Sequence, residues 1–511
     1  METQVVVIGG GITGTGIIRD LAMRGISVIL VEKGDLANGT SARFHGLLHS
    51  GARYAVNDPN SARECIMENA ILKKIAPHCI ENTGGIFLEL QGDDSAYVEK
   101  WRFACRETGI SYQEIDPQEL TKKEPLLSRN IRRAFQVPDA AVDGFKLVLE
   151  NIASAKKYGA KIFTYTQVVS ISVSSGKVIG VTVRKPTGET EFIFCQMVIN
   201  AGGPWAGEIA KLVGLNLNLI LNKGALLVFN RRLTGTIINR CQEPGDGDIL
   251  VPHHSISIYG TTSIDVKEAD CDRVDYWEVK KLLALGQKMF PSLGEARIIR
   301  AFAGVRPLYQ SGEKIEGNQG REVTRDFFIL DHESIDGLSG FISVIGGKFT
   351  TYRLMAEKTG DLAVKKLGKN SPCRTYQEIL PGHFNADSKR KLKVEDKLIC
   401  ECEQIRESQL KEAIINDGCF DLNDLRRRTR LGMGTCQGTF CTYRALNVLK
   451  NYLPSEEMDL DPVLLNFYKE RWKGMQPVFW GSTIKEGELM RRIYADFLAG
   501  EGGVERNEQN P

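Results

Sequence analysis

The chain has 511 residues, more than one hydrophobic core ordinarily supports, so about two or three folded units are expected. Hydrophobic residues make up 42% of it and charged residues 25%, which excludes a disordered, fibrous or collagen-like protein. Because 66 basic residues stand against 64 acidic ones, the formal charge of +2 provides no global field for an anionic polymer. No nucleic-acid partner is therefore expected.

No targeting signal stands out in the sequence. The first residues lead directly into an apolar run without a basic segment, and every apolar run is far shorter than the roughly 20 residues that cross a bilayer. We expect a cytoplasmic protein, with any attachment to a membrane peripheral or through a partner. In a reducing cytoplasm clustered cysteines more often bind metals than form disulfides, so the spacing of the twelve cysteines is informative.

The N-terminus carries a dinucleotide-binding motif. Residues 5–8 form a β-branched run, residues 9–14 read G-x-G-x-x-G, and residues 26–31 are apolar again. This order predicts a strand, a tight turn and a helix whose N-terminus faces a pyrophosphate. Glu32 ends the second strand, where its carboxylate would accept hydrogen bonds from a ribose diol and repel a 2′-phosphate. FAD or NAD is favoured over NADP, and a purely structural turn is the alternative. The motif glycines are Gly9, Gly11 and Gly14.

Two later segments favour FAD over NAD. Residues 198–203 form a strand that ends on small residues, among them Gly202. Residues 340–348 form another strand, which ends on Gly346 and Gly347. Flavoproteins use such turns to approach the cofactor, and a helix expected after the second one would stabilise negative charge on a reduced flavin. Each segment alone fits ordinary α/β packing, but with the first motif they favour FAD.

Residue patterning divides the chain into units. Alternating polar and apolar residues in 169–173 and 179–183, with a turn between them, predict an antiparallel hairpin. The fold class expected is α/β, a Rossmann-like FAD-binding domain with an inserted antiparallel-sheet substrate domain. The predicted units are an FAD-dependent oxidoreductase domain at 1–365, a linker at 366–395, a cysteine-bearing domain at 396–450 and an aromatic-rich packing or docking tail at 451–511.

Four cysteines have a distinctive spacing. One residue separates Cys400 from Cys402, and Cys436 and Cys441 follow after 33 residues with four between them. Thiolates select zinc, copper(I) or iron-sulfur clusters, and this spacing differs from the C-x2-C pairs usual in structural zinc sites. The spacing alone leaves an iron-sulfur cluster, zinc and unmetallated thiols open. No disulfide is predicted among the other cysteines.

The combination of motifs resembles a known family. The residues that carry the resemblance are the four cysteines and the segments 9–16, 45–54, 304–308, 346–353 and 471–474. Together they resemble FAD-linked glycerol-3-phosphate dehydrogenases, specifically the large catalytic A subunits of the anaerobic bacterial enzyme, over nearly the whole chain. The cysteine spacing is similar to that of bacterioferritin-associated-ferredoxin-like domains, small helical domains that bind a 2Fe-2S cluster through four cysteines.

The resemblance implies a reaction and partners. The protein would oxidise sn-glycerol 3-phosphate to dihydroxyacetone phosphate by hydride transfer to FAD, and electrons would leave through the 2Fe-2S cluster. An iron-sulfur membrane-anchor subunit, together with a companion flavoprotein subunit, would deliver them to quinone, which places the protein at the cytoplasmic face of the cell membrane. Near the later cysteines, three glycines are expected to let backbone amides approach the sulfurs: Gly432, Gly434 and Gly438.

A phosphate ester needs cations, and four basic residues lie beside glycine or proline or at predicted strand ends. Each alone would suit a solvated surface charge, but the resemblance implies that all four hold substrate: Arg53, Arg306, Arg325 and Lys348. Arg321 is close enough in sequence to compete with Arg325. The resemblance also puts Tyr54 and Thr262 on the substrate side, the latter in a Gly-Thr-Thr loop.

Three residues are candidates to take the hydroxyl proton of the substrate: His49, Tyr54 and Lys348. Histidine has the most suitable ordinary pKa. The hypothesis is that His49, or a water that it orients, takes the proton while Arg306 stabilises the developing alkoxide. Three other histidines are expected to be structural or near the flavin: His45, His253 and His254.

Two other functions fit parts of the sequence. The same fold would serve an FAD oxidase or dehydrogenase of an amino acid or a 2-hydroxy acid, whose carboxylate also seeks arginines. The second alternative is a non-catalytic electron carrier, in which the C-terminal domain is the function and the flavin only relays electrons. The basic run 426–430 would offset the charge of the cluster, meet an acidic partner or form a solvated helix face. Apolar tail residues at helical spacing would dock a partner or pack on the same protein: Leu464, Phe467, Tyr468, Trp472 and Met475.

Overall fold

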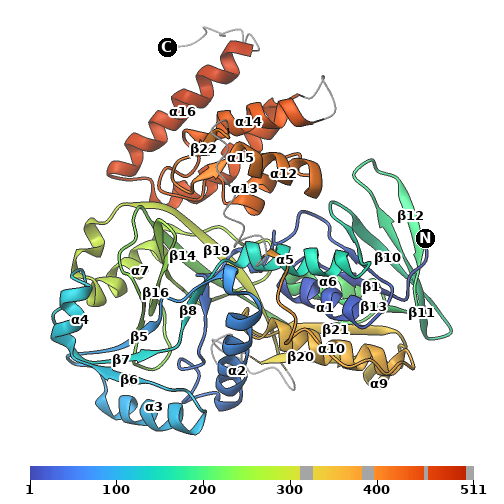
Figure 1. Cartoon of the computed structure of the whole chain (residues 1–511), viewed down its shortest axis with the longest axis horizontal. Coiled ribbons are helices and arrows are strands. Elements are labelled where there is room, and N and C mark those ends of the chain that lie inside the picture. Colours follow the sequence, from blue (N-terminus) through green and yellow to red (C-terminus); the bar gives the residue numbers. More distant parts are fainter. Residues whose placement is uncertain (311–325, 383–395, 454–458, 502–511) are drawn as a thin grey trace.

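The computed structural model describes residues 1–310, 326–382, 396–453 and 459–501, and side chains as far as Tyr494. Figure 1 shows three parts: a nucleotide-binding layer around a mostly parallel sheet, a large and mostly antiparallel sheet beside it, and a helical part formed by the chain after residue 396. The predicted α/β fold class, with an inserted antiparallel sheet and a small helical C-terminal domain, is confirmed.

A six-stranded sheet forms the nucleotide-binding part. Its order is β20-β21-β13-β1-β2-β9, and all neighbours run parallel except β20 and β21. The central strands are buried and apolar except for Asn200 at the end of β13, as is usual for parallel strands covered on both faces. The strands are β1 (Val5–Ile8), β2 (Val28–Val31), β9 (Lys161–Phe163), β13 (Met197–Asn200), β20 (Phe327–Asp331) and β21 (Phe341–Gly346).

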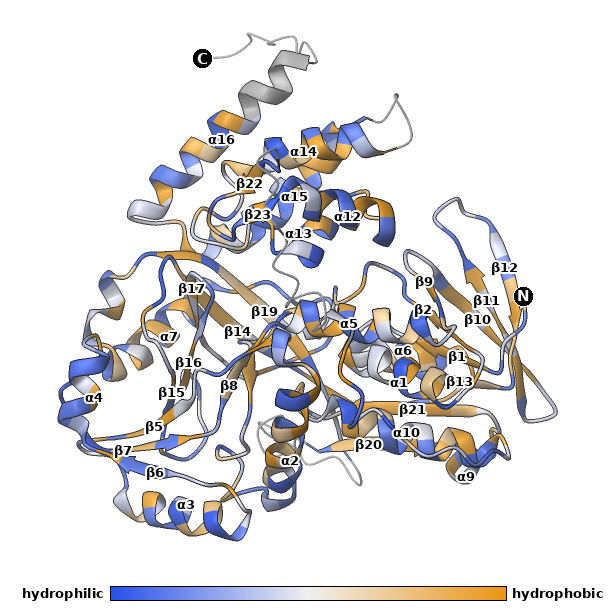
Figure 2. Cartoon of the chain, viewed as in Figure 1, coloured by the Kyte–Doolittle hydropathy of each residue, from blue (hydrophilic) through white to orange (hydrophobic). Residues whose placement is uncertain are grey.

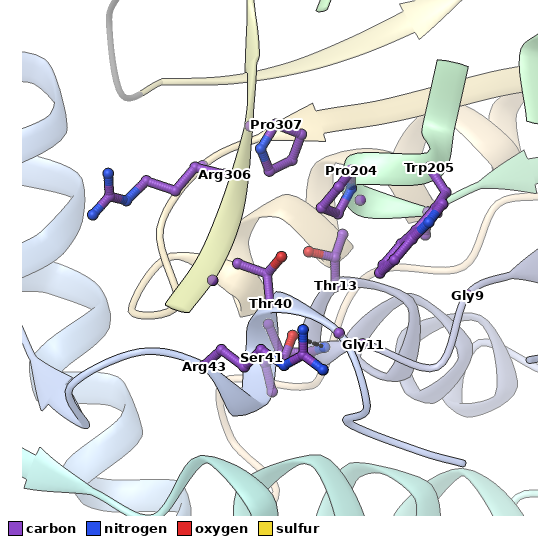
Figure 3. A pocket seen from close by; sticks show the side chains of 18 of the residues that line it. Gly9, Gly11, Thr13, Thr40, Ser41, Arg43, Pro204, Trp205, Arg306 and Pro307 are labelled. Carbon is purple, nitrogen blue, oxygen red and sulfur yellow. Dashed lines mark hydrogen bonds between the residues drawn. The ribbon is translucent and has the colours of Figure 1, made fainter. Parts of the chain in front are cut away.

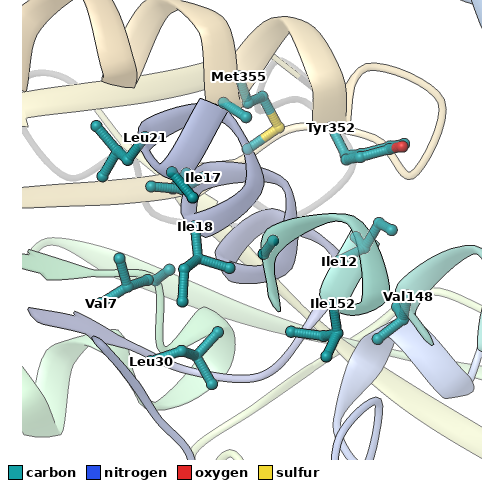
Figure 4. Close-up of a cluster of buried hydrophobic side chains, with 14 of the residues drawn as sticks. Val7, Ile12, Ile17, Ile18, Leu21, Leu30, Val148, Ile152, Tyr352 and Met355 are labelled. Carbon is teal, nitrogen blue, oxygen red and sulfur yellow. The ribbon is translucent and has the colours of Figure 1, made fainter. Parts of the chain in front are cut away.

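Helices on one face of this sheet build the main core. Ile17, Ile18 and Leu21 are fully buried there, as Figure 4 shows. Gly16 lets two helices come close, because a Cβ at this position would lie 2.8 Å from a ring carbon of Tyr352. This packing fixes the start of the first helix, and with it the glycine-rich turn. The helices are α1 (Ile12–Met23), α5 (Gly144–Lys157) and α10 (Tyr352–Lys366).

The predicted antiparallel hairpin is confirmed. Strand β10 (Gln167–Ser174) pairs with β11 (Lys177–Arg184), and β12 (Thr190–Phe194) extends the pair to a three-stranded sheet. Buried valines of this sheet pack with Val6 and Ile8 of β1. The hairpin therefore covers the second face of the nucleotide-binding sheet and is separate from the large sheet.

The large sheet takes its strands from two separated stretches of chain, 85–137 and 219–309. Its order is β18-β14-β17-β16-β15-β5-β7-β6, with β19 paired to β14. The sequence patterning predicted an antiparallel sheet but did not locate these strands. They are β5 (Gly85–Leu90), β6 (Gln113–Ile115), β7 (Ile131–Val137), β14 (Leu219–Phe229), β15 (Ile237–Arg240), β16 (Ile249–His253), β17 (Ile256–Gly260), β18 (Ile264–Val266) and β19 (Ile298–Tyr309).

Further helices flank the large sheet, and a small sheet joins it to the nucleotide-binding part. In the small sheet β3 (Leu47–Leu48) pairs with β8 (Ala140–Val142), which also pairs with β4 (Ile80–Glu81). The pairing holds the histidine-containing segment around β3 between the two main sheets. The flanking helices are α2 (Pro59–Ile75), α3 (Ser95–Glu107), α4 (Pro117–Lys123) and α7 (Tyr276–Met289).

The chain after residue 396 forms a short hairpin and five helices within the described residues. Leu464, Phe467 and Met475 of the tail are buried in one core with α12 and α14, whereas Trp472 remains 36% exposed. Most of the predicted apolar stripe therefore packs on its own protein. The elements are β22 (Leu398–Cys400), β23 (Ile405–Arg406), α12 (Glu407–Asp417), α13 (Leu422–Thr429), α14 (Cys441–Tyr452), α15 (Asp461–Met475) and α16 (Ser482–Glu501).

Figure 2 shows apolar residues gathered along the sheet strands, with polar residues on the outward sides of the helices. This is the distribution expected when sheets and helix faces bury each other. Among the described helices, none combines the length and the apolar character that crossing a membrane requires.

Candidate active site and cluster site

A cavity of about 570 Å³ lies between the nucleotide-binding sheet and the large sheet. Most of the predicted cofactor glycines line it, together with segments that the motifs did not include. In Figure 3, Arg306 and Trp205 lie on opposite sides of the view, with Thr40 and Thr13 between them and the glycine-rich turn near Trp205. The predicted cofactor residues on its wall are Gly9, Gly11, Glu32, Gly202, Gly346 and Gly347.

The glycine-rich turn leaves no room for side chains. Gly9 has a φ of +117°, and a Cβ there would lie 2.4 Å from the carbonyl oxygen of Ala201. A Cβ on Gly14 would lie 2.0 Å from the carbonyl oxygen of Gly9, so Gly14 serves the turn by packing beneath it. Gly11 precedes α1 directly, and the helix N-terminus thus faces the cavity as an anion site would require.

Glu32 has the position of a ribose-binding carboxylate. Its two oxygens accept hydrogen bonds from the amides of Gly10 at 2.7 Å and Gly34 at 2.8 Å. Burial raises the pKa of this carboxyl, although the two amides act in the opposite direction. Each oxygen keeps a second acceptor position for a diol on the cavity side.

Trp205 supplies a donor that the protein itself does not use. Its indole Nε1 is buried and, within the described part of the chain, has no hydrogen-bond partner. The Lys33 ammonium lies 4.3 Å from the ring centroid, which adds positive charge beside it. Nearby, the Ser41 hydroxyl accepts from the amide of Ile12 at 2.9 Å and fixes the loop before β3. A long cavity with an anion site, a ribose carboxylate and an unused donor fits FAD.

Arg306 and Lys348 lie in the part of the cavity away from Trp205. Arg306 donates from Nη1 to Asn222 Oδ1 at 2.6 Å and from Nη2 to Thr261 Oγ1 at 2.7 Å, which fixes the plane of the guanidinium. Lys348 donates to Ser61 Oγ at 2.6 Å. Burial lowers the pKa of Lys348 below its ordinary value of 10.5.

His49 stands beside these cations in an aromatic group. Its ring centroid is 5.3 Å from that of Tyr54 and 5.7 Å from that of His45, and the Lys348 ammonium lies 4.7 Å from the centroid of Tyr54. Burial, followed by the influence of the neighbouring His45 and the positive charge of Arg53, lowers the pKa of His49 well below 6.5. The imidazole is therefore neutral and able to accept a proton. His45 also lines the cavity, and burial lowers its pKa to about 3.

Two predicted substrate residues, Arg53 and Thr262, lie away from the cavity wall, and a third is not described. Arg53 is paired with Asp248, at 3.0 Å between Nη2 and Oδ2, and does not line the cavity. Thr262 is fully buried, its hydroxyl donates to Glu278 at 2.8 Å, and its neighbour Thr261 faces the cavity instead. Adjacent strand-end residues point to opposite sides, so one position decides which threonine faces the site. Arg325 and its competitor Arg321 lie outside the described residues.

The four predicted cluster cysteines come together as two pairs of thiols. Cys400 and Cys441 are hydrogen-bonded, as are Cys402 and Cys436, and Cys441 also senses the charges of the second pair. The hydrogen bond from Cys441 lowers the pKa of Cys400 to about 6, with burial acting against it. Across the described residues no three His, Cys, Asp or Glu side chains converge as ligands of a single ion would. Two adjoining pairs suit a cluster with two irons.

Glycines bring the backbone close to these sulfurs. The amide of Gly432 donates to Cys400, and the amide of Gly438 donates to Cys436. A Cβ on Gly434 would lie 2.4 Å from the Cβ of Cys402, so a larger residue would push this thiol aside. Amide hydrogen bonds to sulfur stabilise the negative charge that a cluster with four thiolates carries.

Two family models match the chain. Residues 4–353 match the FAD dependent oxidoreductase family, and residues 398–451 match the BFD-like [2Fe-2S] binding domain. The chain is 42% identical to the anaerobic glycerol-3-phosphate dehydrogenase A subunit of Escherichia coli strain K12, over all of this chain and 98% of that protein. It is 41% identical to the anaerobic glycerol-3-phosphate dehydrogenase subunit A1 of Haloferax volcanii, over 96% of this chain and 90% of that protein.

The chain belongs to the family of anaerobic glycerol-3-phosphate dehydrogenase A subunits. The family, the oxidoreductase class and both cofactors predicted from the sequence, FAD and a 2Fe-2S cluster, are confirmed. The domain match also decides between an iron-sulfur cluster and zinc, which the cysteine spacing had left open.

Solved structures share the fold of this family. The glycerol-3-phosphate dehydrogenase of Bacillus halodurans complexed with FAD has a TM-score of 0.59 at 24% identity and covers 97% of this chain and 94% of its own. Glycine oxidase from Geobacillus kaustophilus has a TM-score of 0.60 at 21% identity and covers 74% and 98%. These likenesses show the fold and carry no substrate information.

The sequence motifs missed several residues on the cavity wall. Thr261 directly adjoins Thr262, and Trp205 lies two residues after the segment 198–203; only the fold shows which neighbours face inward. Ser61 and Asn222, which hold Lys348 and Arg306, belong to α2 and β14 and carry no motif. The loop of residues 38–43 is rich in small polar residues, which was the available signal.

Proposed function

We propose that this protein oxidises sn-glycerol 3-phosphate to dihydroxyacetone phosphate, with FAD as the hydride acceptor and the 2Fe-2S cluster as the outlet for single electrons. The observation that carries the proposal is that Arg306, Lys348 and His49 line the same cavity as the residues that fit FAD. The names of the full-length relatives support the same reaction. When bound, FAD supplies the acceptor for the hydride that leaves C2 of the substrate.

The cations are proposed to hold the phosphate. Arg306 offers a guanidinium plane already fixed by Asn222 and Thr261, and Lys348 offers a point charge. Arg325 is proposed to add a third cation, and Tyr54 a hydroxyl donor. Arg53, held by Asp248, would act through the electrostatic potential at His49. Thr262, bonded to Glu278, would hold the loop that presents Thr261.

His49 is proposed to take the proton of the C2 hydroxyl. Its imidazole is neutral before substrate arrives, because burial and the neighbouring cations keep its pKa low. A bound phosphate dianion beside Arg306 and Lys348 would offset those cations and raise the pKa of His49, which improves it as a base at the moment of reaction. Arg306 would stabilise the oxygen from which the proton leaves.

The protein is proposed to work within a larger assembly. Both full-length relatives described above are named as single subunits of the anaerobic enzyme, which supports companion subunits here as well. We propose that a companion flavoprotein subunit joins this chain, and that an iron-sulfur membrane-anchor subunit passes electrons to quinone. This chain would then be peripheral, at the cytoplasmic face of the membrane.

A polyol phosphate is favoured as the substrate class. A D-erythritol 1-phosphate dehydrogenase from Brucella abortus is 31% identical over 69% of this chain and 72% of that protein. The amino-acid or 2-hydroxy-acid alternative would place a carboxylate against the same cations. The two classes differ in charge, since a phosphate ester carries up to two negative charges and a carboxylate one.

The test is anaerobic stopped-flow absorbance of the FAD- and cluster-loaded protein. Glycerol 3-phosphate is expected to bleach the flavin first and the cluster second, whereas lactate and amino acids leave both oxidised. Inorganic phosphate should compete. If an amino acid or a hydroxy acid bleached the flavin instead, the protein would be an oxidase or dehydrogenase of that acid. If no small substrate bleached the flavin, even with co-expressed companion subunits, the protein would be a non-catalytic electron carrier.

A further inference from the structure

Between the cavity and the cluster lies one turn of the large sheet, formed by His253, His254 and Ser255, which connects β16 to β17. On its cavity side His253 packs against Gly46, where a Cβ would lie 2.7 Å from His253 Cδ2. Gly46 directly follows His45, which lines the cavity. On its other side the Ser255 hydroxyl donates to Glu403 at 3.2 Å.

Glu403 directly follows the cluster ligand Cys402, and the contact there is tight. A Cβ on Gly434 would lie 2.4 Å from Cys402 Cβ, 3.1 Å from a carboxylate oxygen of Glu403 and 3.3 Å from Ser255 Oγ. The turn therefore touches the cluster-binding loops on one side and the wall of the cavity on the other. A continuous series of packed residues joins His45 to Cys402.

A buried ion group holds this contact closed. Arg430 donates from Nε to Glu403 Oε2 at 2.9 Å, and its Nη1 lies 3.5 Å from Asp143 Oδ2. The side chains of Arg430, Glu403 and Asp143 are 12%, 1% and 10% exposed. Glu403 and Arg430 belong to the cluster domain, whereas Asp143 precedes α5 of the nucleotide-binding part. Arg430 thus ties the two parts together at the turn.

The neighbouring residues support this role of Arg430. Burial acts to raise the pKa of Asp143, but the charge of Arg430 holds it below its ordinary value, so the carboxylate remains charged. His253 and His254 stack with ring centroids 5.2 Å apart, and burial lowers the pKa of His253 to about 3, so it adds no positive charge to the turn. The group is a single cation between two carboxylates.

We infer that Arg430 is a positioning residue for electron transfer: it holds the Cys402 side of the cluster against the turn of His253 to Ser255, and so against the cavity. The inference rests on the proposed function for its electron source. In each transfer one electron leaves the reduced flavin and one enters the cluster, with no bond formed or broken. Two such transfers are needed to reoxidise the flavin fully, because a 2Fe-2S cluster takes one electron at a time.

Replacing Arg430 should therefore slow the transfer between cofactors while leaving each cofactor intact. In Arg430→Gln the two carboxylates repel each other, so the form in which Glu403 and Cys402 lie against the turn becomes less populated, while Arg427 and Arg428 still pair with Asp35. If that form falls to about a tenth of the molecules, the observed rate falls about tenfold. Arg430→Lys retains the charge and should recover most of the rate. Arg444→Gln is the matched control, because Arg444 pairs with Glu401 beside the same cluster but does not contact the turn.

The experiment is laser-flash photoreduction of the bound flavin with a sacrificial amine donor, without glycerol 3-phosphate, followed by absorbance of the flavin and the cluster. Because no substrate is added, failure of the substrate assignment does not affect the result. Hydrogen exchange of the apo-protein provides a second readout, and peptides covering 253–255 and 430–434 should exchange faster in Arg430→Gln. Transfer at the wild-type rate in Arg430→Gln, or an equal loss in Arg444→Gln, would overturn the inference.

A second variant keeps the test valid if Arg430→Gln fails to hold its cluster. Asp143→Asn removes the charge that pairs with Arg430 on the nucleotide-binding side, at a position far in sequence from any cysteine of the cluster. Its side chain still accepts from the amide of Lys146, as Asp143 does at 3.0 Å, so α5 keeps its N-cap. Slower transfer with unchanged cluster absorbance is expected, and an unchanged rate would contradict the role of Arg430.

Discussion

The two cofactor sites of this protein are assembled in different ways. The four cluster thiols lie within residues 400–441 of one small domain, at the end of β22, at the start of α14 and on the loops beside them. The cavity instead takes His49, Arg306 and Lys348 from the segment around β3, from β19 and from the end of β21, which belong to three separate sheets. A local site depends on a few residues and their loops, whereas an assembled site depends on the whole fold around it.

Close glycine contacts show the same difference. At Gly434 the nearest obstacle to a Cβ is Cys402, which belongs to the same small domain. At Gly9 the obstacle is the carbonyl of Ala201, a residue that directly follows β13 and is distant in the sequence. A change at Gly434 should therefore disturb the cluster alone, whereas a change at Gly9 should move two parts of the nucleotide-binding sheet.

The largest effect is expected from Cys400→Ser, which tests whether the cluster site is independent of the cavity. Loss of one thiolate should abolish the 2Fe-2S absorbance and the transfer of electrons to one-electron acceptors, because the cluster needs all four ligands. Flavin content and flavin bleaching by glycerol 3-phosphate should persist. Cys419→Ser is the control, since Cys419 is a buried cysteine of the same domain outside the ligand set. A variant of Cys400 that kept its cluster would show that the assigned ligand is wrong.

The next effect is expected from His49→Asn, a change confined to the assembled site. Loss of a general base slows proton transfer by about 10²- to 10⁴-fold, and stopped-flow bleaching of the flavin should fall by this order. FAD content and cluster absorbance should not change. His78→Asn is a control away from the cavity. If the bleaching rate of His49→Asn matched that of the unaltered protein at every pH, the proton would have to go to another group.

A smaller effect is expected from Gly9→Ala, which tests the long-range contact directly. The new Cβ would meet the carbonyl of Ala201 in a backbone conformation that L-residues avoid, at a cost of about 1–3 kcal/mol. FAD affinity should weaken by on the order of tenfold to a hundredfold, measured by fluorescence titration of the apo-protein. Gly25→Ala is the matched control, because Gly25 has a φ of +75° but open space around it. Equal losses in both variants would assign the effect to backbone strain alone.

The same contrast explains what the sequence alone predicted. The glycine-rich turn, Glu32 and the four cysteines are local patterns, and each lies where the motif implied. Thr262 and Arg53 were assigned from the family resemblance, and in the structure their side chains meet Glu278 and Asp248. Glu278 belongs to helix α7, and Asp248 directly precedes β16. Strands β14, β16 and β17 of the large sheet have consecutive buried residues, so both of their faces are covered. Alternation of polar and apolar residues therefore did not reveal them.

The smallest effect concerns the buried histidines and the stability of the fold. Burial lowers the folded-state pKa of His45 and of His253 to about 3, whereas the unfolded chain binds these protons near pH 6.5. Below pH 6.5 the unfolded state thus binds more protons, and each histidine lowers stability by about 1.4 kcal/mol per pH unit as the pH falls towards 3.

Replacing one of these histidines should flatten that dependence. The loss of unfolding free energy between pH 6.5 and pH 5, measured by urea denaturation, should shrink by about 1.5 kcal/mol in His45→Gln and again in His253→Gln. Measurements at pH 8, where histidines are neutral in both states, separate the packing cost of each substitution from its proton linkage. An unchanged pH dependence in His45→Gln would mean that this imidazole is protonated in the folded protein, and a positive charge would then stand beside Arg306.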